Sequence, residues 1–219
     1  MGVKVTILDK DVPRGLALAE KTGSYFVEVE ISDHSSVVKG LESARSRFGF
    51  ERLCVNCAGI APAQRTVSNG ESHDSALFEK VVSVNLNGTF NLSSLSAAGM
   101  INLPLLKKSD DRGIIINTTS IAANEGQIGQ LAYSASKAGV SGMVLPMARD
   151  LADYRIRVVG IAPGIFSTPM VRNLPKEIQD KLGSAIPFPS RLGKPKEFAA
   201  LVIQVIENSM LNGEVIRLD

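Results

Sequence analysis

Several residue types are scarce in this chain of 219 residues, which has no tryptophan, two cysteines and two histidines. Two cysteines cannot form a disulfide framework, and so few cysteines and histidines argue against a protein-ligated zinc site. The 24 lysines and arginines against 22 aspartates and glutamates leave a net charge of +2, which is too small for a surface built to bind nucleic acid or anionic lipid. The purely apolar runs fall far short of the roughly 18 residues that a membrane span requires. We therefore expect no metal, nucleic acid or membrane as a partner.

Two hydrophobic periods alternate along the chain and predict its fold class. Strand-like runs and helical runs follow one another repeatedly, which is typical of a mostly parallel sheet with helices on both faces. We expect a single domain over residues 1–219, an α/β domain with a Rossmann-like, doubly wound sheet. Strands are predicted at Val3–Leu8, Tyr25–Glu30, Leu53–Asn56, Gly113–Thr118, Arg157–Ile161 and Glu214–Leu218. Helices are predicted at Val12–Lys21, Ser35–Phe48, Leu77 to about Ala98, Ala132–Leu151 and Lys196–Glu207. Loops are expected at Pro62–Asp74 and Pro163–Pro189, the second forming a lobe over one sheet edge.

Tyr133 and Lys137 are the most informative pair of residues. They stand four positions apart at the start of a predicted helix, so both side chains lie on one face at roughly 6 Å from each other. A fixed ammonium group favours the phenolate of a nearby tyrosine, and the pair can then exchange a proton with an alcohol or carbonyl oxygen. An isolated Tyr-x-x-x-Lys is more often a pair of surface neighbours, so this hypothesis needs further support.

Ser120 gives the first support. It follows the apolar run Ile114–Ile116 and Asn117, so it lies at the carboxyl end of a predicted strand, where open α/β sheets bind their ligands. Its hydroxyl can hold a substrate oxygen beside Tyr133.

Further elements resemble the classical short-chain dehydrogenases/reductases. Asn56-Cys57-Ala58-Gly59 matches the N-x-A-G element of that family, and Asn85 matches the catalytic asparagine of its long central helix. Ser120, Tyr133 and Lys137 stand at the family's catalytic spacing. Pro163-Gly164-Ile165-Phe166-Ser167-Thr168 matches its P-G-x-x-x-T element. The elements occur in the family's order, which makes the resemblance specific.

The resemblance implies a catalytic role for four residues. Tyr133 would be the general acid/base, Lys137 would depress its pKa and bind the nicotinamide ribose, and Ser120 would orient the substrate oxygen. Asn85 would hold a water that links Lys137 to solvent. Asparagines of this kind are more often buried hydrogen-bonding residues, so the role of Asn85 depends on the whole set.

The same resemblance implies residues that bind cofactor and substrate. Asn56, Cys57, Ala58 and Gly59 would line the cofactor site. Phe166 would lie beside the nicotinamide and Thr168 would contact its carboxamide. Gln127 would lie beside the substrate. Cys54 and Cys57 spell C-x-x-C, but residues three apart in a strand lie about 10 Å apart on opposite faces, so we expect no disulfide between them.

Asp9 predicts the choice of cofactor. It ends the first predicted strand, where a carboxylate can accept hydrogen bonds from both hydroxyls of an adenosine ribose and repel a 2′-phosphate. This favours NAD over NADP, although Lys10 beside it softens the repulsion. Glu30 and Ile31 end the following strand, where the family usually has an aspartate and an aliphatic residue that flank the adenine.

One departure from the family concerns the start of the chain. In a dinucleotide-binding unit the acidic residue lies about 20 residues beyond a glycine-rich turn, but only eight residues precede Asp9. The first strand of the family, its T-G-x-x-x-G-x-G loop and the next helix are therefore expected to be missing. The missing strand belongs between those that end at Asp9 and Asn56, with Met1 interpreted as an internal methionine. It stays open whether the chain as given binds NAD.

Three further stretches, Gly126–Gln130, Pro187–Gly193 and Asn212–Asp219, resemble a branch of the family that acts on 3-hydroxyacyl-CoA. This implies an NAD-dependent enzyme that interconverts a short or branched 3-hydroxyacyl-CoA and its 3-oxoacyl-CoA. One alternative is a 3-oxoacyl carrier-protein reductase, which Asp9 disfavours because such reductases generally use NADPH. Another is a non-catalytic scaffold subunit with the same fold. A homotetramer is expected from the family, in the cytoplasm or the mitochondrial matrix.

Overall fold

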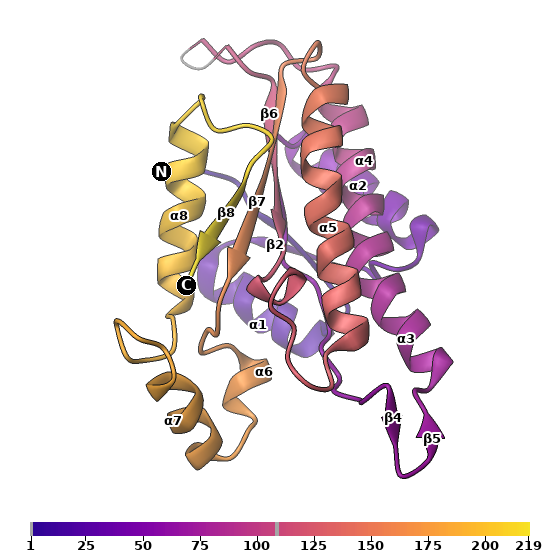
Figure 1. The fold of residues 1–219 in the computed structure, drawn as a ribbon. Coiled ribbons are helices and arrows are strands. Elements are labelled where there is room, and N and C mark those ends of the chain that lie inside the picture. Colours follow the sequence, from indigo (N-terminus) through magenta and orange to yellow (C-terminus); the bar gives the residue numbers. More distant parts are fainter. Residues whose placement is uncertain (1, 108–109) are drawn as a thin grey trace.

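Parallel strands form two sheets in the computed structural model, which describes residues 2–107 and 110–219 (Figure 1). The smaller sheet pairs β1 with β2, the larger has the order β3-β6-β7-β8, and every pair in both sheets is parallel. An antiparallel hairpin of β4 and β5 stands apart. The strands are β1 (Thr6–Asp9), β2 (Tyr25–Glu28), β3 (Leu53–Asn56), β4 (Val67–Ser68), β5 (Glu71–Ser72), β6 (Gly113–Thr118), β7 (Ile156–Pro163) and β8 (Val215–Leu218). The interpretation of Met1 falls on a residue outside those described.

Helices connect the strands, and three of those described begin after an aspartate whose side chain accepts a hydrogen bond from a free N–H group. Asp11 accepts a hydrogen bond from the Arg14 N–H at the start of α1, and Asp33 accepts one from the Ser35 N–H at the start of α2. Gly23 ends α1 with a φ of 68°, in the left-handed region that favours glycine. The helices are α1 (Val12–Thr22), α2 (His34–Phe48), α3 (Ser75–Val82), α4 (Gly88–Met100), α5 (Leu131–Asp150), α6 (Pro169–Arg172), α7 (Lys176–Ser184) and α8 (Pro195–Glu207), with a π-helical segment η1 (Ser83–Asn87) and a 3-10 turn η2 (Ile121–Ala123).

The helix predicted from Leu77 to about Ala98 is present as the contiguous α3, η1 and α4, with the π-helical turn η1 as an unpredicted feature inside it. The Gly88 N–H bonds to the carbonyl oxygen of Ser83, five residues back, which gives this turn its wider π-helical form. Beside it, the Thr89 hydroxyl donates to the carbonyl oxygen of Asn85 at 2.7 Å. Single π-helical turns within helices occur frequently at functional sites.

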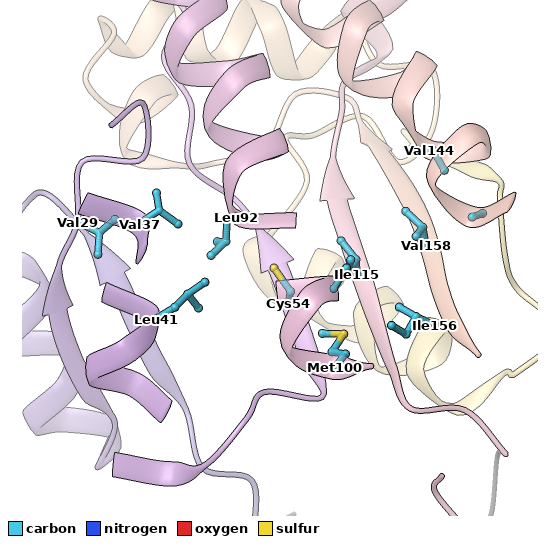
Figure 2. Close-up of a cluster of buried hydrophobic side chains, with 12 residues drawn as sticks. Val29, Val37, Leu41, Cys54, Leu92, Met100, Ile115, Val144, Ile156 and Val158 are labelled. Atoms are coloured by element: carbon cyan, nitrogen blue, oxygen red, sulfur yellow. The ribbon is translucent and has the colours of Figure 1, made fainter. Parts of the chain in front are cut away.

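Side chains of the larger sheet alternate between two cores. Ile115 and Val158 face α4 and α5, whereas Ile116 and Val159 face α8, and all four are fully buried. The first core extends past α4 to α2 and to Val29, just beyond β2 (Figure 2). Helices thus cover both faces of the sheet, and the expected Rossmann-like α/β class is confirmed.

The two sheets meet without sharing a ladder. Among the described residues, no backbone hydrogen bond joins β1 to β3, so each strand has one edge without a strand partner. Side-chain contacts connect the sheets instead, since Leu8 and Val27 pack against the core that contains Cys54.

Two segments predicted as loops contain regular structure. The hairpin of β4 and β5 lies within Pro62–Asp74, and its turn is Asn69-Gly70, both with positive φ, a combination typical of tight hairpins. The segment Pro163–Pro189 contains α6 and α7, which form a lobe at the carboxyl ends of β7 and β8 (Figure 1). The predicted lobe is therefore present. It contains two helices that were not predicted, because the prolines indicated a loop.

Arg157 connects β7 to α8 at the end of the sheet opposite the lobe. Its guanidinium is buried, and its Nε donates to Asp111 Oδ2 at 2.9 Å. The two terminal nitrogens donate to four carbonyl oxygens at the end of α8 and just beyond it, those of Val205, Ile206, Asn208 and Leu211.

Within the part of the chain that the structure describes, no helix combines the length and the apolar character that crossing a membrane demands.

Candidate active site

Tyr133, Lys137 and Ser120 come together at the carboxyl edge of the larger sheet. Ser120 follows β6, and the other two stand on the first turns of α5. Lys137 Nζ lies 5.9 Å from the centroid of the Tyr133 ring and donates to the carbonyl oxygen of Thr118 at 2.7 Å. The buried Ser120 hydroxyl forms a hydrogen bond with Tyr133 and accepts one from the Ala122 N–H at 3.1 Å. A hydroxyl, a phenol and an ammonium group thus converge.

Burial controls the protonation of this cluster. It raises the pKa of Tyr133, and the hydrogen bond with Ser120 only partly offsets this rise. It also lowers the pKa of Lys137 to about 8. Burial disfavours the ionised form of both groups, and the depression of the Tyr133 pKa by Lys137 stays a prediction.

Asn85 holds three segments together and is fully buried. Its Oδ1 accepts from the Ile60 N–H at 2.8 Å, and its Nδ2 donates to the Ile60 carbonyl oxygen at 2.9 Å and to Ser136 Oγ at 3.0 Å. Gly59 runs so close that a Cβ there would lie 3.2 Å from Asn85 Oδ1 and 3.7 Å from Lys137 Nζ. The segment after β3, η1 and α5 therefore meet at this asparagine.

Buried hydroxyls contact the carbonyl oxygens of both candidate catalytic residues on α5. Ser136 Oγ donates to the carbonyl oxygen of Tyr133 at 2.7 Å, and Thr119 Oγ1 donates to that of Lys137 at 3.2 Å. Thr119 also bonds to the hydroxyl of Ser141. Sequence reasoning missed Ser136 and Thr119, although the position of Ser136 between Tyr133 and Lys137 was a usable signal.

The N-x-A-G element divides its residues between core and surface. Asn56 is buried, and its Nδ2 donates to Ser93 Oγ at 3.0 Å and to Asn117 Oδ1 at 2.9 Å. Its side chain thus belongs to the core between the sheet and α4. Cys57 and Ala58 are exposed beyond the strand, and Thr118 Oγ1 donates to Cys57 Sγ at 3.7 Å. Both cysteines are free, Cys54 buried and Cys57 exposed, so they form no disulfide.

Asp9, Glu30 and Ile31 lie at the carboxyl ends of the smaller sheet. The exposed Asp9 carboxylate accepts from the Asp11 N–H at 2.9 Å. Glu30 Oε2 lies 3.3 Å from Lys10 Nζ. Partial burial raises the pKa of Glu30, but hydrogen bonds from Ser32 and the charge of Lys10 outweigh it and lower that pKa overall.

Ile31 packs on the start of α4, where a Cβ on Gly88 would lie 2.8 Å from its Cγ2. This contact brings the end of the smaller sheet next to η1, which holds Asn85. The residues expected at the two ends of the cofactor are thus neighbours through α4.

Phe166, Thr168 and Gln127 lie around this edge in different settings. The Phe166 ring covers Gly193, where an added Cβ would come within 2.8 Å of three ring atoms. Thr168 stands at the start of α6. Gln127 is exposed and lines an open groove of about 690 Å³ between the 64–67 segment and α5, with Arg65 at its rim. Among the described residues, no group of three or more His, Cys, Asp or Glu is placed to hold a metal.

The residues present fit a nicotinamide cofactor at both of its ends. Gly59 lies so close to Asn85 that an added Cβ would be crowded, and the exposed Asp9 carboxylate offers an acceptor at the other end. Between these ends, the described residues contain no glycine-rich turn joining β1 to β3. The fit is therefore to the two ends of a dinucleotide.

Comparisons with known proteins agree with this geometry. A model of the short chain dehydrogenase family matches residues 1–179. Human 3-hydroxyacyl-CoA dehydrogenase type-2 is 48% identical over 223 residues, a match that covers 100% of this chain and 85% of the human protein. A 3-oxoacyl-[acyl-carrier-protein] reductase of Thermotoga maritima is 33% identical, with 97% of this chain and 81% of that protein covered. The crystal structure of 3-hydroxyacyl-CoA dehydrogenase type-2 from Mycobacterium avium matches with a TM-score of 0.93 at 40% identity, over 100% of this chain and 85% of its own.

Proposed function

Because the chain belongs to the short-chain dehydrogenase/reductase family, we propose that it interconverts a short or branched 3-hydroxyacyl-CoA and the corresponding 3-oxoacyl-CoA with NAD as cofactor. The chain is an oxidoreductase that acts on a CH–OH group with a nicotinamide cofactor. The observation that carries the finer proposal is the convergence of Ser120, Tyr133 and Lys137 at the sheet edge.

The chemistry assigned to these residues is a proton transfer. Because its pKa is raised, Tyr133 stays protonated near neutral pH and can donate its proton to a ketone oxygen that accepts a hydrogen bond from Ser120. In the reverse direction the phenolate takes the proton of the alcohol, so oxidation gains from higher pH. A bound nicotinamide cofactor would supply the hydride chemistry, with NADH as donor in reduction and NAD+ as acceptor in oxidation. Lys137 would bind the nicotinamide ribose through its buried ammonium group.

Asp9 supports NAD over NADP as the cofactor. Its exposed carboxylate stands at the end of β1, where it can accept hydrogen bonds from ribose hydroxyls and repel a phosphate. Lys10, the cation that would soften this repulsion, is paired with Glu30 at 3.3 Å. The negative charge of Asp9 therefore still favours NAD over NADP.

The relatives support a CoA ester as substrate. Two proteins similar over the whole chain are named 3-hydroxyacyl-CoA dehydrogenase type-2, whereas the carrier-protein reductase is more distant. Arg65, exposed at the rim of the groove beside Gln127, offers a cation for a CoA phosphate. A carrier-protein reductase is the second candidate, supported by its match to 97% of this chain.

For the assembly we propose a homotetramer built through α3, α4, α5 and β8. The outer face of α5 presents the exposed small residues Ala135, Ala138 and Gly142 between Leu131 and Leu145, which are 45% and 44% exposed. Such a face permits close helix packing against a second copy. For the compartment, the two free cysteines suit the cytoplasm or the mitochondrial matrix, where thiols stay reduced.

A cofactor and substrate matrix tests the proposal. Purified chain is assayed with 3-hydroxybutyryl-CoA and with its carrier-protein thioester, each with NAD and with NADP. We expect turnover with the CoA ester and NAD, and loss of turnover in Tyr133→Phe. Turnover restricted to the carrier-protein ester with NADP would support the second candidate, and absence of turnover with intact folding would support a scaffold.

A further inference from the structure

Ser136 lies between the two candidate catalytic residues of α5 and is fully buried, yet the chemistry above gives it no task. A serine that donates to the carbonyl oxygen three residues back is common in helices, so its 2.7 Å bond to Tyr133 is not distinctive. Its second bond is, because the donor is Asn85, 51 positions earlier in the chain. Ser136 therefore connects two segments that sequence separates.

The hydrogen bonds of this cluster have a fixed direction. The Ile60 N–H needs an oxygen acceptor, so Asn85 must turn Oδ1 toward it and Nδ2 toward Ser136. Ser136 Oγ then accepts from Asn85 and is left to donate its own proton to the Tyr133 carbonyl oxygen. Turning the Asn85 amide by 180° would set donor against donor at Ile60. Each side-chain bond thus fixes the next.

This chain of bonds links the cofactor side of the site to its proton donor. Ile60 follows the N-x-A-G element directly, and the neighbouring Gly59 comes close to both Asn85 and Lys137. At the other end, the Tyr133 carbonyl belongs to the turn of α5 that carries the phenol. A shift of one end must therefore move the other or break a buried bond.

We propose that Ser136 is a positioning residue: through Asn85 it holds the turn of α5 that carries Tyr133 in register with the segment after β3. The proposal rests on the proposed function, because it assigns Ser136 the task of placing the Tyr133 hydroxyl against the substrate oxygen. Ser136 touches neither substrate nor cofactor and acts through its two neighbours.

The experiment compares Ser136→Ala with Ser134→Ala in the full chain. Ser134 is the matched control, since it lies on the same turn and its hydroxyl has no hydrogen-bond partner among the described residues. For Ser136→Ala we expect kcat to fall roughly tenfold with KM little changed, below the 100-fold that a 1 Å misplacement can cause. Ser136→Thr, which keeps the hydroxyl, should retain most of the activity.

A double-mutant cycle separates positioning from general stability. If the two residues act through one network, Asn85→Ala with Ser136→Ala should lose no more kcat than Asn85→Ala alone. A residue that only stabilised the fold would lower the melting temperature and leave kcat per folded molecule unchanged in the single variant. Unchanged kcat in folded Ser136→Ala would overturn the proposal.

Hydrogen exchange at the Ile60 amide provides a readout that needs no turnover. We expect this amide to exchange at least about tenfold faster in Ser136→Ala, because the orientation of its acceptor Asn85 loosens, and to be unchanged in Ser134→Ala. If the unmodified chain turns over no 3-hydroxyacyl-CoA, the proposed function fails while this measurement still decides the coupling. An unchanged exchange rate of the Ile60 amide in Ser136→Ala would contradict the inference in either case.

Discussion

The four-stranded sheet and the two-stranded sheet carry different halves of the candidate site, and they differ in how their strands are paired and buried. β6 and β7 are paired on both edges, and their apolar side chains are almost completely buried. β1 and β2 are only half-buried, and their carboxyl ends expose Asp9. The proposed proton transfer would thus take place on the better-buried sheet, and the proposed recognition of the cofactor's ribose on the smaller one.

The comparison also shows how the two units communicate. Within the described residues they share no ladder between β1 and β3, but one hydrophobic core crosses from Val29 and Val37 to Ile115 (Figure 2). Packing of this kind tolerates small shifts that a strand ladder would forbid. Cofactor affinity should therefore be more easily altered than the catalytic step.

The largest effect on kcat is expected from a change at Tyr133, at the edge of the four-stranded sheet. General acid/base catalysis contributes about 100- to 10,000-fold, so Tyr133→Phe should lower kcat by at least that order. NADH affinity should stay within about twofold, because the phenol hydroxyl is only one of several contacts. Steady-state kinetics and calorimetric titration measure the two quantities, and near-normal turnover of the variant across the pH range would contradict the role of Tyr133.

Joining a strand–turn–helix unit ahead of β1 tests how the two-stranded sheet contributes to cofactor binding. A unit with the sequence T-G-x-x-x-G-x-G can pair with the free edges of β1 and β3 and offer backbone donors to a pyrophosphate. We expect NADH to bind about 100-fold tighter, as two or so charge-assisted hydrogen bonds would give.

The control for this extension carries alanines in place of its glycines, which restores strand pairing without the phosphate cradle. Isothermal titration of all three chains checks the expectation. Equal NADH affinity in the extended and unextended chains would show that the free edges of β1 and β3 are irrelevant to binding.

Lys137 should make stability depend on pH in a defined window. Its folded pKa is about 8, below the ordinary 10.5, so between these values the unfolded chain binds a proton that the folded chain does not. The free energy of unfolding should therefore rise with pH across this window, by up to about 3 kcal/mol relative to Lys137→Met. Urea unfolding of both chains at pH 7.5 and 10.5 measures the difference, and parallel pH dependences would refute it.

The smallest effect concerns the choice of cofactor. Asp9→Ala removes the repulsion of a 2′-phosphate and should narrow the preference for NAD over NADP by roughly tenfold, the order of one charge contact. Glu28→Ala, also an exposed carboxylate of the same sheet, is the matched control. Equal kcat/KM with both cofactors in the unmodified chain would already contradict the premise.

The sequence predicted the fold well wherever hydrophobic periodicity decides structure. β3 and β6 have the predicted bounds because they are short apolar runs, and α1, α2 and α8, each with one buried face, differ by a residue or so. Hydrophobic periodicity could not show the π-helical turn at η1, since a single extra residue in a helical turn leaves the apolar pattern on both sides intact. The hairpin at Asn69-Gly70 carried its usual turn signal but lay in a segment judged only by its prolines and polar residues.

The convergence of Ser120, Tyr133 and Lys137 was predictable from the sequence, and the electrostatics of the cluster were less so. Spacing alone brought Tyr133 and Lys137 to one face, and the strand end supplied Ser120. The pKa of Tyr133 could not be predicted, because burial depends on the packing of segments distant in sequence. The same limit hid Ser136, whose partner Asn85 is a neighbour only in the folded chain.

The guanidinium of Arg157 carries a consequence for inherited variation in this protein. One side chain serves a buried carboxylate and four carbonyl oxygens at the end of α8, so even lysine, with three donors on one nitrogen, leaves several of them without a partner. Replacing Arg157 should therefore destabilise the fold, although the residue stands at the end of the sheet remote from the candidate active site. Missense changes there should reduce the amount of protein in the cell, with the specific activity of the surviving molecules unaltered.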